Sequence, residues 1–286
     1  MNKLKPLPEE WSGLLNNEQK EAIENINGPL LIIAGAGSGK TRVLTYRYAH
    51  LIKTYGINFE NVLAITFTNK AANEMKDRIS DLLNLELSPK WISTFHSLCV
   101  KMLRIHGHLI GFNNNFTIYD QSDSTKLVRN CMRDSDIDTK QYSPKRIQAH
   151  ISSLKNQRIL PGEAVEFAQS FFDVKVAEIY SSYQKKLMLA NSMDFDDLLI
   201  KAVELLETSD KSLNYWSSKF QYIMIDEYQD TNMVQYRLVE LLASKHKNIC
   251  VVGDSDQSIY AFRGADIRNI EEFESDFKNA KVISLE

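Results

Sequence analysis

Short runs of apolar and β-branched residues alternate along the chain with longer stretches in which apolar residues recur every three or four positions. The runs have the length and composition of buried strands, and they cover residues 30–34, 62–67, 91–94, 222–225, 249–252 and 282–285. Between them, Ala71, Met75, Ile79 and Leu82 have the spacing of one helical face. Strands that alternate with amphipathic helices predict an α/β fold, with a parallel sheet and helices on its faces.

One region interrupts this alternation. Residues 112–190 contain no run typical of a buried strand, whereas segments 143–156 and 164–190 have the spacing of amphipathic helices. We therefore predict a helical subdomain, residues 112–190, inserted into an α/β domain formed by residues 1–111 and 191–286. The acidic segment MDFDD at 193–197 follows the insertion, and we interpret it as a helix start with solvated charge rather than as a metal site.

The composition narrows the class of protein. With 286 residues, 43% hydrophobic and 25% charged, the chain is typical of a soluble globular protein with a sizeable core. It has no apolar stretch long enough to span a membrane and no secretory leader. Cys99, Cys131 and Cys250 lack the spacing of a zinc site, which favours buried thiols in a reducing cytoplasm. The net charge of -3 does not exclude nucleic-acid binding, because phosphate contacts need only a local basic groove.

The strongest local signal is a glycine-rich loop between a strand and a helix. Residues 30–44 read LLIIAGAGSGKTRVL, in which the apolar strand ends at Ala34 and a helix follows the loop. Such a loop aims backbone N–H groups and a helix N-terminus at phosphate oxygens. We expect Lys40 to neutralise the β- and γ-phosphates of a nucleotide and the Thr41 hydroxyl to hold Mg²⁺. The strict phosphate-loop pattern has Gly where this chain has Ala34, so a mechanical pattern search would miss the motif.

A pair of acidic residues follows another predicted strand. In YIMIDEYQD, Asp226 and Glu227 stand at the C-terminal end of strand 222–225, which is the end where ligands bind in parallel sheets. We expect Asp226 to hold Mg²⁺ through its water shell, and Glu227 to orient and deprotonate the attacking water. Adjacent carboxylates on a turn are usually only solvated charge, but the buried strand and the phosphate loop favour catalysis. Together the two motifs predict an enzyme that hydrolyses ATP with Mg²⁺.

The remaining motifs, in their order along the chain, resemble those of superfamily 1 helicases of the UvrD/PcrA/Rep family. LNNEQKEAI at 15–23 is similar to the Q motif, AITFTNKAANEMKDRI at 64–79 to motif Ia, and STFHSLCVKMLR at 93–104 to motif Ib. MDFDDLL at 193–199 resembles the segment that returns the chain to the α/β domain. DEYQDTN at 226–232 and VVGDSDQSIYAFRGADI at 251–267 resemble the Walker B motif and motif III. The match covers essentially the whole chain outside the insertion.

This resemblance implies a RecA-like P-loop NTPase domain, called 1A, with an inserted helical subdomain called 1B. Gln19 would then read the adenine edge through its amide. Gln257 in motif III would sense the γ-phosphate and act in catalysis beside Lys40 and Glu227. The resemblance and the loop together predict nucleotide contacts at Gln19, Ala34, Gly35, Ala36, Gly37, Ser38, Gly39, Lys40, Thr41 and Arg42.

The resemblance also implies contacts with single-stranded DNA. Tyr260 and Phe262 follow Gln257 within five residues, so one short segment can reach ATP and DNA together, and aromatic rings stack on unpaired bases without choosing sequence. The family most often has Trp where this chain has Phe262, which leaves stacking with less area. Phe67 is a second candidate platform, with core packing as its alternative. The expected contacts along the DNA backbone are Thr66, Thr68, Asn69, Thr94, His96 and Ser97.

Several roles remain open at this level. His96 is equally readable as a structural histidine, and Arg263 either pairs with an acid to couple the two sites or is structural. The family implies ATP-driven 3′-to-5′ movement on single-stranded DNA and at single-strand/duplex junctions, in replication or repair. Its second motor domain, 2A/2B, carries motifs IV to VI with arginines that stabilise the transferred phosphoryl group. Because the chain stops at Glu286, before those motifs, we expect it to bind nucleotide and DNA weakly and not to unwind duplexes alone. The alternatives are an ATPase switch with a protein partner and the helicase subunit of a helicase–nuclease complex.

Overall fold

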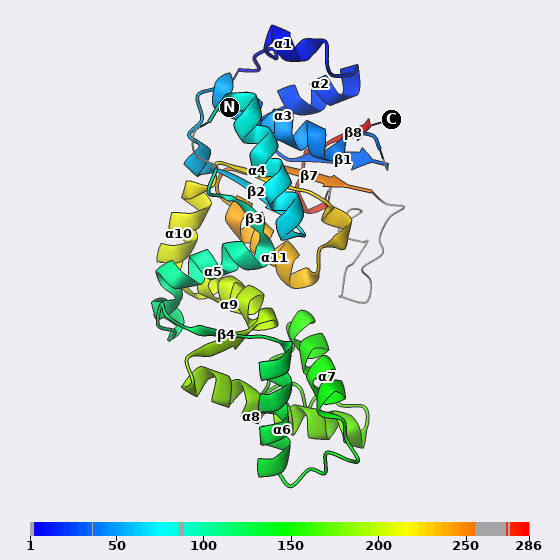
Figure 1. The fold of residues 1–286 in the computed structure, drawn as a ribbon, viewed down its shortest axis with the longest axis vertical. Coiled ribbons are helices and arrows are strands. Elements are labelled where there is room, and N and C mark those ends of the chain that lie inside the picture. The colour runs from blue at the N-terminus through cyan, green and yellow to red at the C-terminus, as the bar shows by residue number, and fades with distance from the viewer. Residues whose placement is uncertain (1–2, 36, 86–88, 255–272, 274, 286) are drawn as a thin grey trace. The chain divides into compact units, whose positions relative to one another are not determined.

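The computed structural model describes residues 3–35, 37–85, 89–254, 273 and 275–285 (Figure 1). Ala36 of the phosphate loop and the motif III residues Gln257, Tyr260, Phe262 and Arg263 lie outside the described residues. The chain forms two compact units. The first consists of Met1–Leu98 and Asp210–Glu286, and the second of Cys99–Ser209. The predicted insertion at 112–190 lies inside the second unit, which also contains residues that we assigned to the α/β domain; its boundaries remain a prediction.

The first unit is built on a six-stranded sheet in which every described pairing is parallel, in the order β3-β2-β6-β7-β1-β8. Each strand coincides, within a residue at either end, with an apolar run, so the prediction of a parallel α/β sheet is confirmed. Strand residues point alternately to the two faces, and the side chains of β2, β3, β6 and β7 are buried on both, which explains their continuously apolar runs. The edge strand β8 instead exposes Lys281, Val282 and Ser284. The strands are β1 Leu30–Ala34, β2 Val62–Thr66, β3 Ile92–Thr94, β6 Tyr222–Ile225, β7 Ile249–Gly253 and β8 Lys281–Leu285.

Helices cover this sheet and place the functional loops. One core cluster joins alternate strand residues such as Ile32, Ala64 and Met224 to the buried faces of α2, α3 and α4. The predicted helix at 71–82 is confirmed by α4, whose Met75 and Ile79 are buried. The helices and 3-10 turns of this unit are α1 Glu9–Ser12, α2 Asn17–Glu24, α3 Lys40–Lys53, η1 Phe59–Asn61, α4 Asn69–Leu83, α10 Asp210–Lys219, η3 Tyr228–Asp230 and α11 Met233–Ala243, and α5 Phe95–His106 begins here and continues into the second unit.

The second unit is mostly helical, with its own core from Val128 to Leu187. Its remaining elements are η2 Gly107–Ile110, β4 Thr117–Tyr119, α6 Gln121–Asp134, α7 Pro144–Asn156, α8 Phe171–Leu189, β5 Ser192–Asp194 and α9 Phe195–Thr208. The helix predicted at 143–156 is confirmed by α7. One expectation was wrong: the helix at 164–190 begins only at Phe171, because Ser170 caps it. The insertion also contains a strand, β4, which pairs with β5 in parallel; it is not a buried strand and so does not contradict the prediction. β4 is short and only partly buried, so the sequence contains no apolar run there that would predict a strand.

The acidic segment at 193–197 is a helix start, as predicted, but its charge is not solvated. Asp194 caps α9, and Asp194 and Asp197 are both buried. Lys155 of α7, which is 1% exposed, donates to Asp194 at 2.7 Å and to Asp197 at 2.8 Å. Burial opposes the charged amine, yet the two carboxylates hold the pKa of Lys155 above its usual value. This segment therefore ties α7 to α9 through a buried ion cluster.

Two other expectations concern the chain as a whole. All three cysteines are buried free thiols, as predicted. Within the described ranges, the structure contains no helix long and apolar enough to cross a bilayer.

Candidate nucleotide and DNA site

The order of the strands brings the predicted ATP-binding segments together. β7 lies between β1 and β6, and β2 lies beyond β6. Because these strands are parallel, their carboxyl ends share one edge of the sheet (Figure 1). The phosphate loop follows β1, Asp226 and Glu227 follow β6, and Asp254 follows β7. This is the edge at which ligands bind in parallel α/β sheets.

The phosphate loop has the backbone that its glycines predict. Gly37 and Gly39 have φ values of +82° and +92°, a left-handed region that glycine adopts without strain. Between them, the Ser38 hydroxyl donates to the Gly35 carbonyl at 2.8 Å and holds the turn. α3 begins directly at Lys40, so the N–H groups of its first turn lie beside the loop without intrahelical partners. Such groups suit an anionic ligand.

Gln19 is packed against this loop. Its Nε2 donates to the Ser38 carbonyl at 3.0 Å, and its Oε1 accepts from the Asn16 amide at 3.2 Å, where it completes the cap of α2. A Cβ at Gly39 would lie 2.9 Å from Nε2 at the end of the flexible Gln19 side chain, which could shift, so it is the φ of +92° that requires glycine there. To read an adenine edge, Gln19 would have to exchange one of these two contacts. Its adenine role remains a prediction.

Lys40 lies between acids from two neighbouring strands. Its Nζ is 3.4 Å from Glu227 Oε2 and 3.7 Å from Asp254 Oδ2. The Lys40 and Asp254 side chains are only 11% and 5% exposed, which strengthens their attraction relative to a solvated pair. Asp254 was not among the residues predicted from the sequence. The signal was available, because Asp254 is the first acid after a predicted strand, as Asp226 is.

Asp226 and Thr41 are the predicted Mg²⁺ ligands, and Thr41 lies near enough to Asp226 to influence its pKa. Burial, followed by the charge of Glu227, raises the pKa of Asp226 to about 6. The Glu227 amide donates to Asp226 at 3.0 Å, and this bond, Lys40 and a hydrogen bond with Thr41 oppose the rise. A desolvated carboxylate beside a hydroxyl is a set of hard oxygen donors. It therefore fits Mg²⁺, which takes one or two protein oxygens and keeps much of its water.

Glu227 occupies a strained turn. Its φ of 49° and ψ of 48° are left-handed, which costs energy for a residue with a side chain. The Asp230 amide donates to the Glu227 carbonyl at 2.9 Å and holds this turn. Gln229, which is 2% exposed, donates from Nε2 to Glu227 Oε2 at 2.8 Å and accepts at Oε1 from the Asp254 amide at 3.1 Å. Gln229 was also not predicted from the sequence, in which it is only a polar residue in the short turn after a buried strand.

The motif Ia residues follow β2 at the same edge. Phe67 is half-buried, and its ring meets Phe95 edge-on with 5.7 Å between the centroids. Thr68 and Asn69 are exposed at the start of α4, where the Thr68 hydroxyl caps the helix by accepting from the Ala71 amide at 3.1 Å. Phe67, Thr68 and Asn69 therefore all present some surface, and their contacts with DNA remain predictions.

The other predicted backbone contacts are less accessible. Thr66 is 1% exposed and donates its hydroxyl to the Thr68 carbonyl at 3.1 Å. Thr94 is 9% exposed; its hydroxyl donates to Ser97 Oγ at 3.0 Å and accepts from the Ser97 amide at 3.3 Å. His96 and Ser97 are half-buried in the first turn of α5. The hydroxyls of Thr66 and Thr94 thus stabilise the turns that follow β2 and β3.

Arg42, the last predicted nucleotide contact, lies on the exposed side of the first turn of α3. Its guanidinium carbon lies 5.8 Å from the centre of the Tyr46 ring, which in turn meets Trp11 edge-on at 5.4 Å. Arg42 is thus exposed, and its contact with a nucleotide remains a prediction.

Comparison of the sequence with known proteins identifies the family of the chain. Residues 15–278 match the UvrD/REP helicase N-terminal domain. The chain belongs to this family. The ATP-dependent DNA helicases PcrA of Staphylococcus epidermidis strain ATCC 35984 and Staphylococcus aureus strain Mu50 are each 50% identical to it over 272 residues. The match covers 95% of this chain and 37% of each relative, so the chain spans well under half the length of these relatives. The resemblance drawn from the motifs is confirmed.

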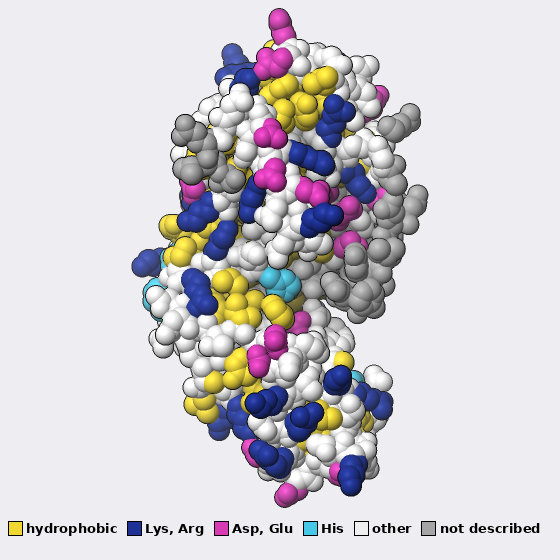
Figure 2. Space-filling view, viewed as in Figure 1, with side chains coloured by type: hydrophobic (Ala, Val, Ile, Leu, Met, Phe, Trp, Pro, Cys, Tyr) yellow, Lys and Arg dark blue, Asp and Glu magenta, His cyan; other side chains and the backbone are white. Residues whose placement is uncertain are grey.

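The surface of this UvrD/REP domain carries a basic area on the second unit. On the face drawn in Figure 2, Lys and Arg side chains gather over that unit. Three of its exposed basic residues, Lys126, Arg129 and Arg133, are spaced by three and four positions along α6 and therefore share one helical face. Such a face can contact phosphate groups without reading sequence.

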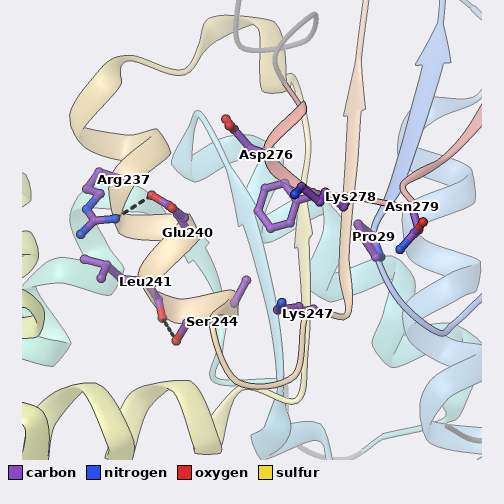
Figure 3. A pocket seen from close by; sticks show the side chains of 11 residues that line it. Pro29, Arg237, Glu240, Leu241, Ser244, Lys247, Asp276, Lys278 and Asn279 are labelled. Atoms are coloured by element: carbon purple, nitrogen blue, oxygen red, sulfur yellow. Dashed lines mark hydrogen bonds and ion pairs between the residues drawn. The ribbon is translucent and has the colours of Figure 1, made fainter. Parts of the chain in front are cut away.

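A separate pocket of about 490 Å³ lies at the opposite edge of the sheet (Figure 3). Pro29, directly before β1, lines it together with Lys247 and Lys278, whereas the phosphate loop follows the other end of β1. Figure 3 shows Arg237 and Glu240 of α11 paired at its wall, 2.7 Å apart. The pocket therefore does not belong to the predicted nucleotide site.

Proposed function

We propose that this domain is the ATP-binding part of a DNA helicase that uses ATP hydrolysis to move 3′-to-5′ along single-stranded DNA in replication or repair. The observation that carries the proposal is one backbone hydrogen bond. The amide of Asp226 donates to the carbonyl of Ile65 at 3.0 Å. Asp226 is the predicted Mg²⁺ ligand, and Ile65 immediately precedes the predicted DNA contacts Thr66 and Phe67. The ATP site and motif Ia are therefore joined by adjacent, hydrogen-bonded strands.

The phosphate loop and Lys40 would bind the triphosphate of ATP. The N–H groups at the start of α3 and the lysine charge favour phosphate oxygens. Thr41 and Asp226 would hold Mg²⁺, which neutralises phosphate charge when it is bound. Because Lys40 is paired with Glu227 and Asp254 in this structure, the phosphate must draw the lysine away from both acids.

Glu227 would then act as the general base. It would accept a proton from water while the water oxygen bonds to the γ-phosphorus. The bond from that phosphorus to the oxygen bridging the β- and γ-phosphates breaks, and ADP and inorganic phosphate leave. The strained backbone at Glu227 supports this role, because left-handed non-glycine residues that neighbouring contacts hold in place are concentrated at active sites.

Full activity would also need the second motor domain, 2A/2B. An arginine aimed at the transferred phosphoryl group is worth about 10³–10⁵ in rate in related enzymes. We propose that such arginines come from the part of the PcrA relatives that this chain does not match, since the match covers 37% of their length. Closure of two domains around ATP would alternately tighten and release the DNA.

DNA would bind across the ends of β2 and β3. Phe67 would stack on an unpaired base, and the exposed Thr68 and Asn69 would contact the backbone. The basic face of α6, with Lys126, Arg129 and Arg133, supports an additional contact with DNA phosphates. The three buried thiols support work in a reducing compartment such as the cytoplasm.

The test compares two duplexes in the protein that carries this domain together with its second motor domain. One duplex has a 3′ single-stranded tail and the other a 5′ tail of the same sequence. We expect ATP-dependent unwinding of the 3′-tailed duplex, and ATP hydrolysis that single-stranded DNA stimulates. Hydrolysis that responds to a protein and not to DNA would replace the helicase with an ATPase switch.

The isolated chain is the second arm of this test. Fluorescent nucleotide and a labelled single strand should each bind it weakly, with little stimulated turnover and no unwinding. Robust unwinding by the isolated chain would mean that it supplies the missing arginine itself or by dimerising.

A further inference from the structure

We infer that Gln229 is a positioning residue for the water-activating carboxylate of Glu227. The inference rests on the proposed ATPase function of the site. The buried amide of Gln229 bridges two strands, because it donates to Glu227 Oε2 after β6 and accepts from the Asp254 amide after β7, at 2.8 and 3.1 Å. With 2% of its surface exposed, Gln229 is poorly placed to touch a nucleotide itself. It acts through Glu227.

These contacts form a closed ring of four residues. Lys40 contacts Glu227 Oε2 and Asp254 Oδ2, at 3.4 and 3.7 Å, and Gln229 joins Glu227 to Asp254 on the other side. The same carboxylate oxygen of Glu227 therefore has two partners, the Lys40 ammonium and the Gln229 amide. The ring spans the ends of β1, β7 and β6, which are neighbours in the sheet.

Nucleotide binding makes the two partners unequal. A triphosphate takes Lys40 as its counter-ion, and this removes both lysine contacts from the ring. Gln229 stays, because its partners are the Glu227 carboxylate and the backbone amide of the buried Asp254. In the state that hydrolyses ATP, Gln229 is therefore the contact that continues to orient Glu227. A misplaced base can cost about 100-fold in rate even when binding is unchanged.

The chemistry of the side chain explains why the residue is a glutamine. An amide offers a donor to the carboxylate and an acceptor to the backbone N–H at the same time. A glutamate of the same length would set one carboxylate against another. A methionine of similar shape would satisfy neither partner.

The experiment uses the protein with its second motor domain and compares Gln229→Met with the wild type. Nucleotide affinity is measured by fluorescent-nucleotide titration, and the rate of hydrolysis by single-turnover assay. We expect affinity within about 3-fold of the wild type and a hydrolysis rate lower by roughly 10–100-fold. Gln229→Glu, which preserves shape but sets a second carboxylate beside Glu227, should lose rate in the same way.

Two comparisons separate positioning from general damage. Gln235→Met removes another buried glutamine, whose amide caps α11, and it should lower the melting temperature without lowering the hydrolysis rate. In the Glu227→Gln background, Gln229→Met should cause little further loss, because the base through which it acts is already gone.

The results distinguish this inference from the proposed function. A wild-type protein that does not hydrolyse ATP would overturn both. If the wild type hydrolyses ATP but Gln229→Met and Gln229→Glu keep its rate within about 3-fold, Gln229 does not position the base. An equal loss from Gln229→Met in the wild-type and Glu227→Gln backgrounds would likewise refute the inference.

Discussion

We predict that the buried negative charge of Asp226, the proposed Mg²⁺ ligand, lowers the stability of the folded protein. It is 5% exposed, and burial followed by the charge of Glu227 raises its pKa to about 6. In an unfolded chain an aspartate has a pKa of about 3.9, and each unit of difference corresponds to about 1.4 kcal/mol. The carboxylate is thus less favourable in the folded protein by up to about 3 kcal/mol. Asp226→Asn keeps the shape and removes the charge.

The sign of the pH dependence follows from this raised pKa. Between about pH 4 and pH 6 the folded protein holds a proton that the unfolded chain has lost, so stability decreases as the pH rises through this window. The destabilisation is absent below about pH 4 and complete above about pH 6. Asp226→Asn should therefore be more stable than the wild type at pH 8, by up to about 3 kcal/mol, and the gain should shrink towards pH 4.5.

Tryptophan fluorescence measures this directly. Trp11, Trp91 and Trp216 are the protein's three tryptophans, and all are buried in the unit that contains Asp226. Melting without nucleotide or divalent cation should show a gain for Asp226→Asn at pH 8 of up to about 6–12 °C, since 1 kcal/mol shifts a domain of this size by about 2–4 °C. Mg²⁺–ATP should stabilise the wild type and not the variant.

The control is Asp77→Asn, which removes an exposed acid from α4 in the same unit. It should change the melting temperature little at either pH. The reasoning fails if Asp226→Asn is less stable than the wild type at pH 8. It also fails if the gain is the same at pH 4.5 and pH 8, because burial of the charge would then not be its cause.

Three further predictions concern other parts of the chain. In a nucleotide titration, Lys40→Ala should lower affinity by roughly 10–100-fold, which is the contribution of a charged hydrogen bond. Glu227→Gln should bind nucleotide at least as well as the wild type, because it removes a carboxylate that competes with the phosphate for Lys40. Phe67→Ala should weaken single-strand binding by about 1–3 kcal/mol in a fluorescence anisotropy assay; a collapse of the melting temperature would mean instead that the ring is part of the core. Lys155→Met should destabilise the second unit by about 3–5 kcal/mol, because two buried carboxylates lose their cation. Denaturant unfolding monitored by circular dichroism measures this loss. An equal loss from Lys145→Met, which removes an exposed lysine of the same helix, would contradict the prediction.

The sequence determined those parts of the protein whose physical cause is local. A short apolar, β-branched run predicts a strand, so all six strands of the main sheet were predicted nearly to the residue, including the partly exposed edge strand β8. Gly37 and Gly39 predict a backbone with positive φ, which only glycine adopts easily. Asp226 and Glu227 stand at a strand end, where parallel sheets bind ligands. Each of these signals is contained in a few consecutive residues.

The tertiary structure decided what depends on partners distant in the sequence. Lys155 lies about 40 residues before Asp194 and Asp197, so nothing in the acidic segment itself revealed that its charge is buried and neutralised. β4 exists because β5, far along the chain, pairs with it. The contact of Gln229 with the Asp254 amide depends on β7 lying beside β6. Local patterns fix where a strand begins and which faces it buries, but the order of strands in a sheet is set by packing of the whole domain, and the ring of Lys40, Glu227, Gln229 and Asp254 arises only from that order.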